Sequence, residues 1–248
     1  MKDFQNKTLN ILVPMAGEGS RLKEYGSVKP LIKIGNLSMI EIVHDNINLN
    51  GNYIYIAKNE HIDLYDIKKH IDNFCKNYIM ISQQGKLNGA AASSLLAKDY
   101  IDNDVPLLII NSDQYLVWDA NNFIDEVLKK YDGGILTFKE SDPRFSYVLE
   151  ENGLISSVVE KEVVSEKATC GVYFWKKGSD YVKYAEKMIS NSIMINGEFY
   201  VGPVFNEAIK DGKKIIAIDC KEMWDLGTPE SLSKFIKYMI KDGVLINE

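Results

Sequence analysis

The chain has 248 residues with 29 Lys+Arg against 35 Asp+Glu, which gives a formal net charge of −6 and a pI near 5.3. Its hydrophobic content of 46% and charged content of 26% are typical of a globular protein that can bury a full core without disulfide bonds. The mild acidity excludes a protein that binds nucleic acid or anionic membranes through a broad basic surface, but it does not exclude one that binds a single nucleotide.

Strand-like and helix-like apolar patterns alternate through the first half of the chain. In chain order, the expected elements are a strand at 9–13, a helix at about 38–48, a strand at 53–57, helical spacing over 60–74, a strand at 78–81, a helix at 90–100 and a strand at 106–110. Alternation of this kind predicts an α/β fold, with a Rossmann-like, mostly parallel mixed sheet flanked by helices on both faces.

The second half is richer in strands. In chain order, the expected elements are strands at 133–138, 147–150, 154–160 and 171–175, helices at about 180–190 and 203–210, a strand at 215–219 and a helix at 230–241. Glu151-Asn152-Gly153 offers a hairpin turn between two of these strands. No linker or repeat divides the chain, so we expect a single domain over residues 1–248 with an inserted substrate-binding lobe.

Cysteine usage and the apolar runs indicate a cytoplasmic protein. Cys75, Cys170 and Cys220 are an odd number with no close pair in the sequence, so neither a disulfide framework nor a thiolate zinc site is expected. Residues 1–17 lack the apolar run of a signal peptide, and the later apolar runs are too short for a membrane helix.

Three polar segments follow predicted strands, and ligands bind beyond the carboxyl ends of strands in parallel sheets. They are the loop at 14–21, the region near Gln84, and Asn111-Ser112-Asp113. Because these strand ends lie at one edge of the predicted sheet, we expect the three segments to converge.

The first of these loops has the residues of a phosphate site. The glycines of Gly17-Glu18-Gly19 would let backbone N–H groups approach phosphate oxygens, and Arg21 would add a charged contact. A tight turn without a ligand explains the two glycines equally well. Lys29 favours the phosphate site, since it places a second cation close to the loop, with Pro30 fixing the chain beside it.

Residues 12–31, LVPMAGEGSRLKEYGSVKPL, resemble the signature of the sugar nucleotidyltransferase family, the nucleotide-sugar pyrophosphorylases. The resemblance continues in order along nearly the whole chain, through 82–91, 111–113, 159–161, 168–175, 196–198 and 224–229. It implies an enzyme that transfers an NMP unit from an NTP to an acceptor phosphate and releases pyrophosphate. Such catalysis is mainly the positioning and charge neutralisation of anions.

The resemblance also implies roles for individual residues. Arg21 would bind the triphosphate, Lys29 would stabilise the departing pyrophosphate, and Lys161 would position the acceptor phosphate. Asp113 and Asp225 would hold Mg²⁺, the implied cofactor. The residues implied in nucleotide binding are Ala16, Gly17, Gly19, Gln84, Gly89 and Ser112, and those implied in acceptor binding are Tyr147, Glu160, Lys161 and Glu198.

Three of these charged residues also have simpler interpretations. Asp113 suits a turn cap, and Asp225 suits the start of the helix that begins near Pro229. Lys161 stands among other charged residues, as on an exposed, ion-paired strand face.

The base-recognition segment leaves the register open by one residue. Gln84 lies at the family's spacing before Gly89, and its amide would pair with the edge of a pyrimidine, since it offers both a donor and an acceptor. Gln83 takes this role if the register is shifted by one residue.

The chain departs from the family pattern at positions that bear on the acceptor. Val28 replaces the usual proline before the lysine, and Val148 follows Tyr147 where sugar-1-phosphate enzymes have Tyr-Gly, so that a valine side chain would intrude on the sugar. Residues 199–203 lack the acidic, threonine-containing pattern that binds hexose hydroxyls. We therefore expect an acceptor other than glucose 1-phosphate.

The partners implied are CTP, UTP or dTTP and a phosphorylated small molecule, with no nucleic acid and no membrane; a homo-oligomer is left open. The expected acceptor is a sugar phosphate or a non-sugar phosphate, such as a choline-phosphate-, phosphonate-, polyol-phosphate- or phospho-amino-acid-like compound. The setting that the family implies is the synthesis of surface-polysaccharide precursors. Two alternatives are a nucleotide-sugar-dependent glycosyltransferase of related fold and a non-catalytic nucleotide-binding homologue. The loop at 17–21 followed by Lys29-Pro30-Leu31 argues against the glycosyltransferase, because a diphosphate donor needs no triphosphate site. The joint presence of Arg21, Lys29, Asp113, Lys161 and Asp225 argues against the non-catalytic homologue.

Overall fold

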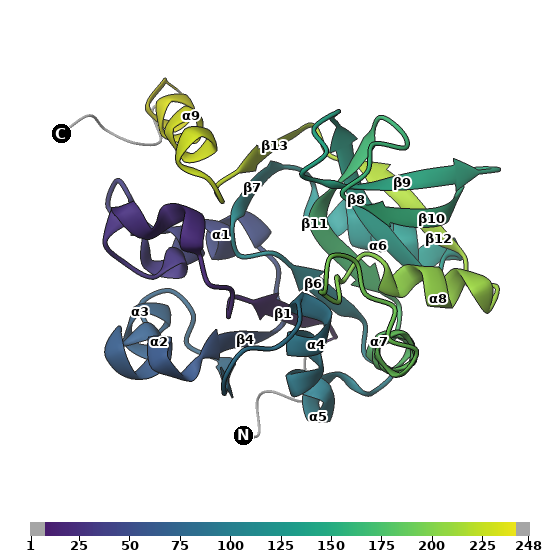
Figure 1. The fold of residues 1–248 in the computed structure, drawn as a ribbon, viewed down its shortest axis with the longest axis horizontal. Coiled ribbons are helices and arrows are strands. Elements are labelled where there is room, and N and C mark those ends of the chain that lie inside the picture. The colour runs from purple at the N-terminus through teal and green to yellow at the C-terminus, as the bar shows by residue number, and fades with distance from the viewer. Residues whose placement is uncertain (1–7, 242–248) are drawn as a thin grey trace.

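The computed structural model describes residues 8–241, and its centre is a nine-stranded mixed sheet (Figure 1). Along the sheet the strands run in the order β5-β4-β1-β6-β11-β8-β12, with the β9–β10 hairpin joined to the beginning of β11. The strands are β1 (Asn10–Pro14), β2 (Lys33–Ile34), β3 (Leu37–Ser38), β4 (Asn52–Lys58), β5 (Tyr78–Gln83), β6 (Leu107–Ile110), β7 (Gln114–Val117), β8 (Gly133–Lys139), β9 (Ser146–Glu151), β10 (Leu154–Glu160), β11 (Lys167–Trp175), β12 (Ile215–Asp219) and β13 (Glu222–Asp225).

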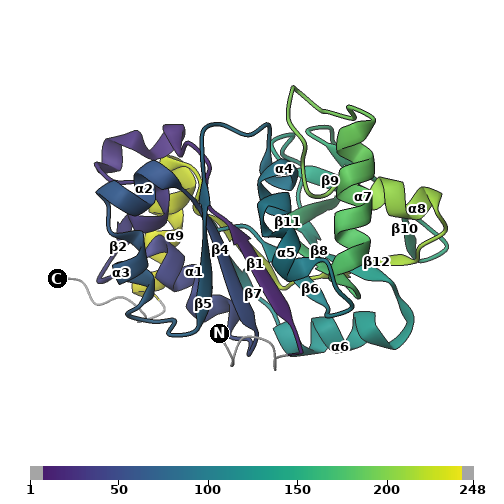
Figure 2. The ribbon, with the colours of Figure 1, turned by 90° about the horizontal axis from the view of Figure 1, so that it is seen from below.

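Helices cover both faces of this sheet, as Figure 2 shows from below. The α-helices are α1 (Met39–Ile47), α2 (Asn59–Leu64), α3 (Ile67–Ile71), α4 (Ala90–Ser94), α5 (Lys98–Ile101), α6 (Ala120–Lys130), α7 (Gly178–Ser190), α8 (Val204–Lys210) and α9 (Pro229–Lys241). No helix within residues 8–241 is both long enough and apolar enough to cross a bilayer. The prediction about a signal peptide falls partly on residues 1–7, which lie outside the described residues.

The parallel half of the sheet confirms the alternation read from the sequence. β1 pairs in parallel with β4 and β6, and β4 pairs in parallel with β5. Successive side chains of a strand point to opposite faces, so Leu12 packs with α4, α5 and α7 while Ile11 and Val13 pack with α1, α3 and α6. Strands buried on both faces explain why these runs are almost continuously apolar.

The other half of the sheet is largely antiparallel. β11 pairs antiparallel with β6 on one side and with β8 on the other, while β12 pairs in parallel with β8. The predicted hairpin turn is confirmed, because Asn152 and Gly153 have φ of 53° and 76° and join β9 to β10.

Several elements differ from the sequence prediction. The helical spacing over 60–74 is broken at Asp66, which has φ of 49° and separates α2 from α3. The expected helix at 90–100 consists of α4, a 3₁₀ turn at Leu95–Ala97 and α5. Helix α6 and the two-stranded ribbon in which β13 pairs antiparallel with β7 were not expected from the sequence.

A separate apolar cluster packs the last helix against the segment that follows the first glycine loop. Leu232, Phe235 and Met239 of α9 lie with Leu22 and Ile32 of the segment that follows this loop. The placement of α9 beside this segment is visible in Figure 1. The C-terminal helix therefore stabilises the segment that carries the predicted phosphate site.

Candidate active site

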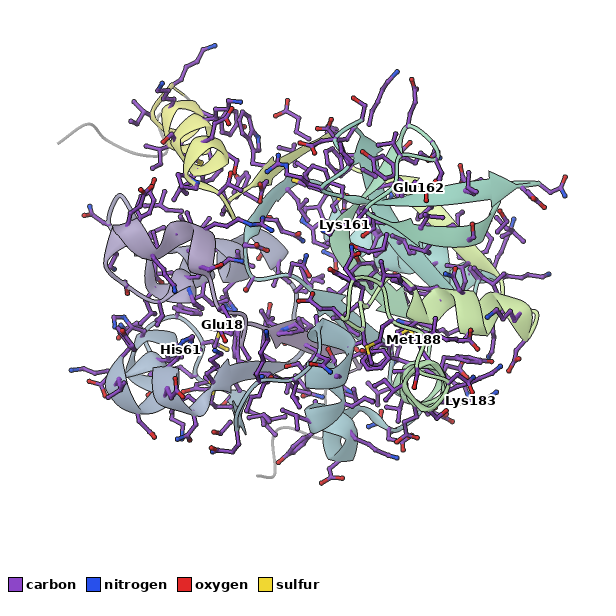
Figure 3. The ribbon with its side chains drawn as sticks, viewed as in Figure 1. Glu18, His61, Lys161, Glu162, Lys183 and Met188 are labelled. Atoms are coloured by element: carbon purple, nitrogen blue, oxygen red, sulfur yellow. The ribbon has the colours of Figure 1, made fainter. Side chains whose placement is uncertain are left out.

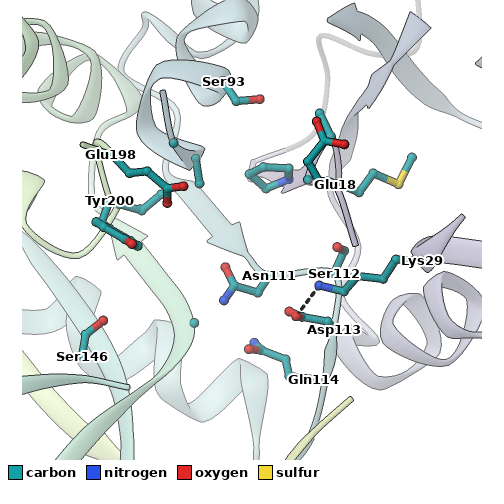
Figure 4. A pocket seen from close by; sticks show the side chains of 18 of the residues that line it. Glu18, Lys29, Ser93, Asn111, Ser112, Asp113, Gln114, Ser146, Glu198 and Tyr200 are labelled. Atoms are coloured by element: carbon teal, nitrogen blue, oxygen red, sulfur yellow. Dashed lines mark hydrogen bonds and ion pairs between the residues drawn. The ribbon is translucent and has the colours of Figure 1, made fainter. Parts of the chain in front are cut away.

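A cavity of about 490 Å³ lies beyond the carboxyl ends of β1 and β6. Eleven of the predicted site residues line it, so the expected convergence is observed (Figure 4): Ala16, Gly17, Arg21, Lys29, Gly89, Ser112, Asp113, Glu160, Lys161, Glu198 and Asp225. Gly19, Gln84 and Tyr147 are absent from its lining.

Gly19 contributes to the first loop through its backbone conformation and its lack of a side chain. Its φ of 59° lies in the left-handed region that favours glycine, and a Cβ there would come within 2.9 Å of the Cβ of Lys29. Gly17, by contrast, faces open space, since a Cβ at this position would have nothing within 4 Å of it. Gly19 therefore allows Lys29 to approach the loop, while Gly17 leaves room for a ligand beside Arg21, whose side chain is exposed.

Antiparallel pairing of β7 and β13 brings two distant carboxylates together. Asp225 is in register with Gln114, and the N–H of Leu226 donates to the carbonyl of Asp113 at 2.9 Å. A Cβ on Gly227 would lie 2.8 Å from Oδ2 of Asp113 and 3.0 Å from Oδ1 of Asp225. Both carboxylates thus border the small space that this glycine leaves empty.

These two carboxylates fit a magnesium ion. Mg²⁺ is commonly held by one or two protein carboxylates, with phosphate and water oxygens completing its coordination. Across residues 8–241 no group of three or more His, Cys, Asp or Glu side chains is arranged to hold a metal, so an ion here would depend on oxygens from a ligand. In the structure each carboxylate instead contacts a cation: Lys29 pairs with Asp113, and Arg144 lies 3.6 Å from Asp225.

Gln83, rather than Gln84, lines the cavity. Its side chain is buried; Oε1 accepts a hydrogen bond from Ser93 at 2.6 Å, and Nε2 donates to the carbonyl of Gly85 at 3.2 Å. Gln84 is exposed, and its amide donates to Ser82. Gln83 is the last residue of β5 and Gln84 follows it, so their side chains point in different directions, and the structure places Gln83, the alternative residue, at the cavity.

The far end of the cavity is formed by the open end of the β9–β10 hairpin. Glu160 is buried there, accepts a hydrogen bond from the Ser146 hydroxyl and has its Oε1 3.6 Å from Nζ of Lys161. Burial raises the pKa of Glu160, while the bond from Ser146 and the charge of Lys161 oppose this shift. Figure 3 shows Lys161 beside this hairpin and Glu18 on the side of the parallel strands.

Tyr147 and Val148 do not face the cavity. The Tyr147 ring is buried and its hydroxyl donates to the carbonyl of Asp142 at 2.8 Å, whereas Ser146 lines the cavity. Val148 packs into the core, so the expectation that its side chain would intrude on a sugar is wrong. Tyr147 points to the opposite face of β9 from Ser146, whereas Val148 shares the face of Ser146 but lies two residues further along the strand, within the core.

Gly89 lies where the segment that follows β5 contacts the loop that carries Glu198 and Tyr200. The N–H of Phe199 donates to the carbonyl of Asn88 at 2.8 Å, which places the backbones in direct contact. Glu198 and Tyr200 then face the cavity from either side of Phe199. Burial, followed by the negative charge of Glu198, raises the pKa of Tyr200 to about 12.

Several lining residues were not expected from the sequence. They are the cations Lys58, Lys86 and Arg144 and the amide Gln114, whereas Asn111 belongs to a segment that was expected there. With them, six Lys or Arg and five Asp or Glu side chains line the cavity, so its balance is cationic although the chain carries −6. Lys58, Lys86, Arg144 and Gln114 reach the cavity through tertiary structure, which no local pattern in the sequence indicates.

The amide side chains of Asn111 and Gln114 pack against the backbone of Gly171, which carries no side chain. A Cβ on Gly171, which has φ of 71°, would lie 2.3 Å from Nδ2 of Asn111 and 2.5 Å from Oε1 of Gln114. The Nε2 group of Gln114 is buried without a hydrogen-bond partner. Gly171 therefore makes room for the side chains of Asn111 and Gln114, which are labelled among the cavity residues in Figure 4.

Comparison with known proteins agrees with this architecture. The protein resembles the bifunctional protein GlmU of Methanocaldococcus jannaschii, with 26% identity over 240 residues; the match covers 94% of this chain and 54% of the relative, so the chain spans about half of that relative's length. Similar solved structures include a nucleoside-diphosphate-sugar pyrophosphorylase from Vibrio cholerae RC9, with a TM-score of 0.76, 20% identity and coverage of 92% and 99% of the two chains.

Two further structures extend the comparison. A putative glucose-1-phosphate thymidylyltransferase from Bacillus anthracis has a TM-score of 0.76 and 21% identity, with 97% of each chain covered. An inositol-1-phosphate CTP transferase from T. maritima has a TM-score of 0.72 and 17% identity, with coverage of 96% and 97%. The family model described as Nucleotidyl transferase matches residues 11–241. The chain therefore belongs to the nucleotidyl transferase family of enzymes.

Proposed function

We propose that this protein transfers an NMP unit from a pyrimidine NTP to a phosphorylated small molecule in a Mg²⁺-dependent reaction that releases pyrophosphate. The observation that carries the proposal is one cavity in which a cationic glycine loop, a pair of carboxylates and a Glu-Lys acceptor end meet. No protein nucleophile is required, because the acceptor phosphate is itself an anion.

The chemistry consists of one in-line displacement at the α-phosphorus. An oxygen of the acceptor phosphate forms the new bond to phosphorus, the bond to the bridging oxygen breaks, and pyrophosphate leaves with the electron pair. Gly17 and Arg21 hold the triphosphate, Lys29 neutralises the departing pyrophosphate, and Lys161 orients the acceptor phosphate. A Mg²⁺ ion held by Asp113 and Asp225 would supply charge neutralisation at the reacting phosphates.

Gln83 is our candidate for reading the base. Ser93 and Gly85 each engage one end of its amide, which fixes the orientation of that amide. One N–H and one lone pair remain to pair with a pyrimidine edge. CTP, UTP and dTTP are therefore the donors that we propose, and Gln84 is the weaker candidate because its side chain is exposed.

The acceptor that we propose is a sugar phosphate or a non-sugar phosphate other than glucose 1-phosphate. The similar structures include one named for glucose 1-phosphate and one named for inositol 1-phosphate and CTP, so a polyol phosphate is within the range that this fold accommodates. At the acceptor end the carboxylates Glu160 and Glu198 suit hydroxyl or cationic substituents. A role in the synthesis of surface-polysaccharide precursors is part of this proposal.

A matrix of NTPs against phosphorylated acceptors, read by pyrophosphate release, tests the proposal. We expect release with a pyrimidine NTP and an acceptor together, and little without the acceptor. A glycosyltransferase would release none, and a non-catalytic homologue would bind nucleotide without turnover. Best kcat/KM with glucose 1-phosphate would refute the acceptor assignment.

Two lysine variants separate the two halves of the reaction. Lys161→Ala should raise KM for the acceptor, whereas Lys29→Ala should impair the use of NTP and the reverse reaction with pyrophosphate. Lys98→Ala is the matched control, since this lysine pairs with Glu186 outside the cavity. Equal damage to both substrates in both cavity variants would contradict the assignment.

A further inference from the structure

Arg144 is a cavity residue that neither the motifs nor the proposed mechanism uses. It lies between β8 and β9, its side chain is half exposed, and its guanidinium borders the cavity. Nε donates to Oδ2 of Asp142 at 2.8 Å, and the backbone N–H donates to Oδ1 of the same carboxylate at 2.9 Å. Asp142 therefore fixes both the backbone and the guanidinium of Arg144.

The guanidinium also reaches the predicted metal site. Nη1 of Arg144 lies 3.6 Å from Oδ2 of Asp225, and that oxygen already accepts a hydrogen bond from Ser231 at 3.0 Å. Asp113, the other carboxylate, is paired with Lys29. Each of the two carboxylates thus has one cation as a neighbour, and Lys29 and Arg144 approach the pair from different segments of the chain.

Arg144 is tied to Lys161 through the backbone of the hairpin. Nζ of Lys161 donates to the carbonyl of Arg144 at 2.7 Å, and the N–H of Lys161 donates to the carbonyl of Phe145 at 3.1 Å. Lys161 has φ of 61°, a strained value for a residue with a side chain, which the pairing of Glu160 with Ser146 helps to maintain. The start of β9 and the end of β10 thereby hold Arg144 and Lys161 at the same end of the cavity.

We propose that Arg144 binds the phosphate of the acceptor together with Lys161, and that Asp142 and Asp225 hold its guanidinium at the cavity until that phosphate arrives. This inference rests on the proposed function and adds a residue to its acceptor site. A phosphomonoester carries close to two negative charges, which one lysine neutralises only in part. The planar guanidinium donates two parallel N–H bonds to phosphate oxygens, a geometry that lysine does not offer.

The position of Arg144 also suits the direction of the reaction. In the proposed reaction, an acceptor phosphate bound at the Glu160 end of the cavity attacks an α-phosphate near the carboxylate pair. The backbone carbonyl of Arg144 accepts a hydrogen bond from Lys161 at one end, and its guanidinium lies 3.6 Å from Asp225 at the other. An ordinary exposed ion pair with Asp142 would stabilise the loop by little and would leave acceptor binding unchanged.

The test measures phosphate binding rather than turnover. The probe is inorganic phosphate, titrated calorimetrically into the enzyme with Mg²⁺, alone and after saturation with α,β-methylene CTP, which occupies the triphosphate site and cannot react. The variants are Arg144→Gln and Arg144→Lys. The control is Lys139→Gln, because Lys139 pairs with Glu166 on the exposed end of β8 and does not line the cavity.

We expect Arg144→Gln to weaken phosphate binding to the analogue-saturated enzyme by roughly tenfold to a hundredfold, as for the loss of a charged hydrogen-bonding group. Arg144→Lys should recover part of the loss, and Lys139→Gln should match the wild type. Binding of the analogue itself should change by less than about twofold in every variant.

Two results would overturn the inference: phosphate binding by Arg144→Gln equal to the wild type, or an equal loss of analogue and phosphate binding, which would place Arg144 at the nucleotide. Unfolding midpoints of the variants show whether a loss of phosphate binding comes from a damaged fold. If Arg144→Gln is damaged, phosphate binding by Arg144→Lys, which keeps the charge, becomes the test. Failure of the wild type to bind the analogue would instead refute the proposed function, and the titration of phosphate alone would still test Arg144.

Discussion

The contact between Gly89 and Phe199 predicts that one added methyl group at residue 89 lowers the free energy of unfolding more than the same change at a glycine without such a contact. In Gly89→Ala the new Cβ would lie 2.4 Å from the carbonyl oxygen of Phe199 and 2.6 Å from its nitrogen, and both atoms are backbone that cannot rotate away. The φ of 99° is itself unfavourable for alanine. The two segments of this contact must therefore separate.

The structure gives the size of the effect. Strain at this φ costs about 1–3 kcal/mol. Separation removes the bonds from Phe199 N–H to Asn88 and from Ala91 N–H to Phe199, at 2.8 and 3.0 Å, each of which contributes about 1 kcal/mol. Together these terms predict a loss of about 3–5 kcal/mol in the free energy of unfolding. Gly85→Ala is the matched control, because Gly85 also has positive φ but nothing lies within 4 Å of its Cβ, so only about 1–2 kcal/mol is expected.

Urea denaturation followed by circular dichroism measures this difference. With a denaturant m-value of about 3 kcal/mol/M, Gly89→Ala should lower the midpoint by roughly 1–1.5 M, and Gly85→Ala by less than half of that. KM should rise for both substrates in Gly89→Ala, since the contact joins the base segment to the Glu198 loop. Equal midpoints for the two variants would refute the reasoning.

Three further predictions concern other parts of the chain. Asp113→Asn and Asp225→Asn should each lower kcat by ~100-fold or more while the unfolding midpoint changes little; near-wild-type turnover with Mg²⁺ in both would refute the two-carboxylate site. Burial lowers the pKa of His44 from 6.5 to about 4, so the unfolded chain binds the proton more tightly than the native protein, and stability should fall as the pH drops from 6.5 towards 4. Midpoints at several pH values should show a flatter profile for His44→Gln. The sulfurs of Cys170 and Cys220 lie 3.5 Å apart, so oxidation by diamide should join them, with a loss of two hydrogens by mass spectrometry that Cys220→Ser abolishes.

The periodicity of apolar residues predicts much of the fold, because the parallel strands are buried on both faces and therefore carry almost only apolar side chains. The run at 106–110 is apolar without interruption since both faces of β6 are covered by helices. The start of α1 was also predictable: Ser38 caps it, and Glu41 completes a capping box. Local chemistry and burial agree at these positions, so the sequence pattern is unambiguous.

Other features depend on information that a pattern does not hold. Nothing in the composition of 60–74 marks Asp66 as left-handed, although this one residue divides the segment into two helices. Adjacent polar residues such as Gln83 and Gln84 differ only in which face of a strand they occupy, and a shift of one residue exchanges them. Arg144 meets Asp225 only through the pairing of distant strands, so no local spacing could identify it.

The ribbon of β7 and β13 has a consequence for the order in which the parts of the protein are completed during synthesis. Asp113 leaves the ribosome with the first half of the chain, but its partner carboxylate is supplied by a strand that follows the last strand of the central sheet. A nascent chain that ends at residue 221 would hold every residue of the nine-stranded sheet and would still lack the second carboxylate and α9. The central sheet and the proposed two-carboxylate site are thus completed at different chain lengths, which truncations before and after β13 can separate.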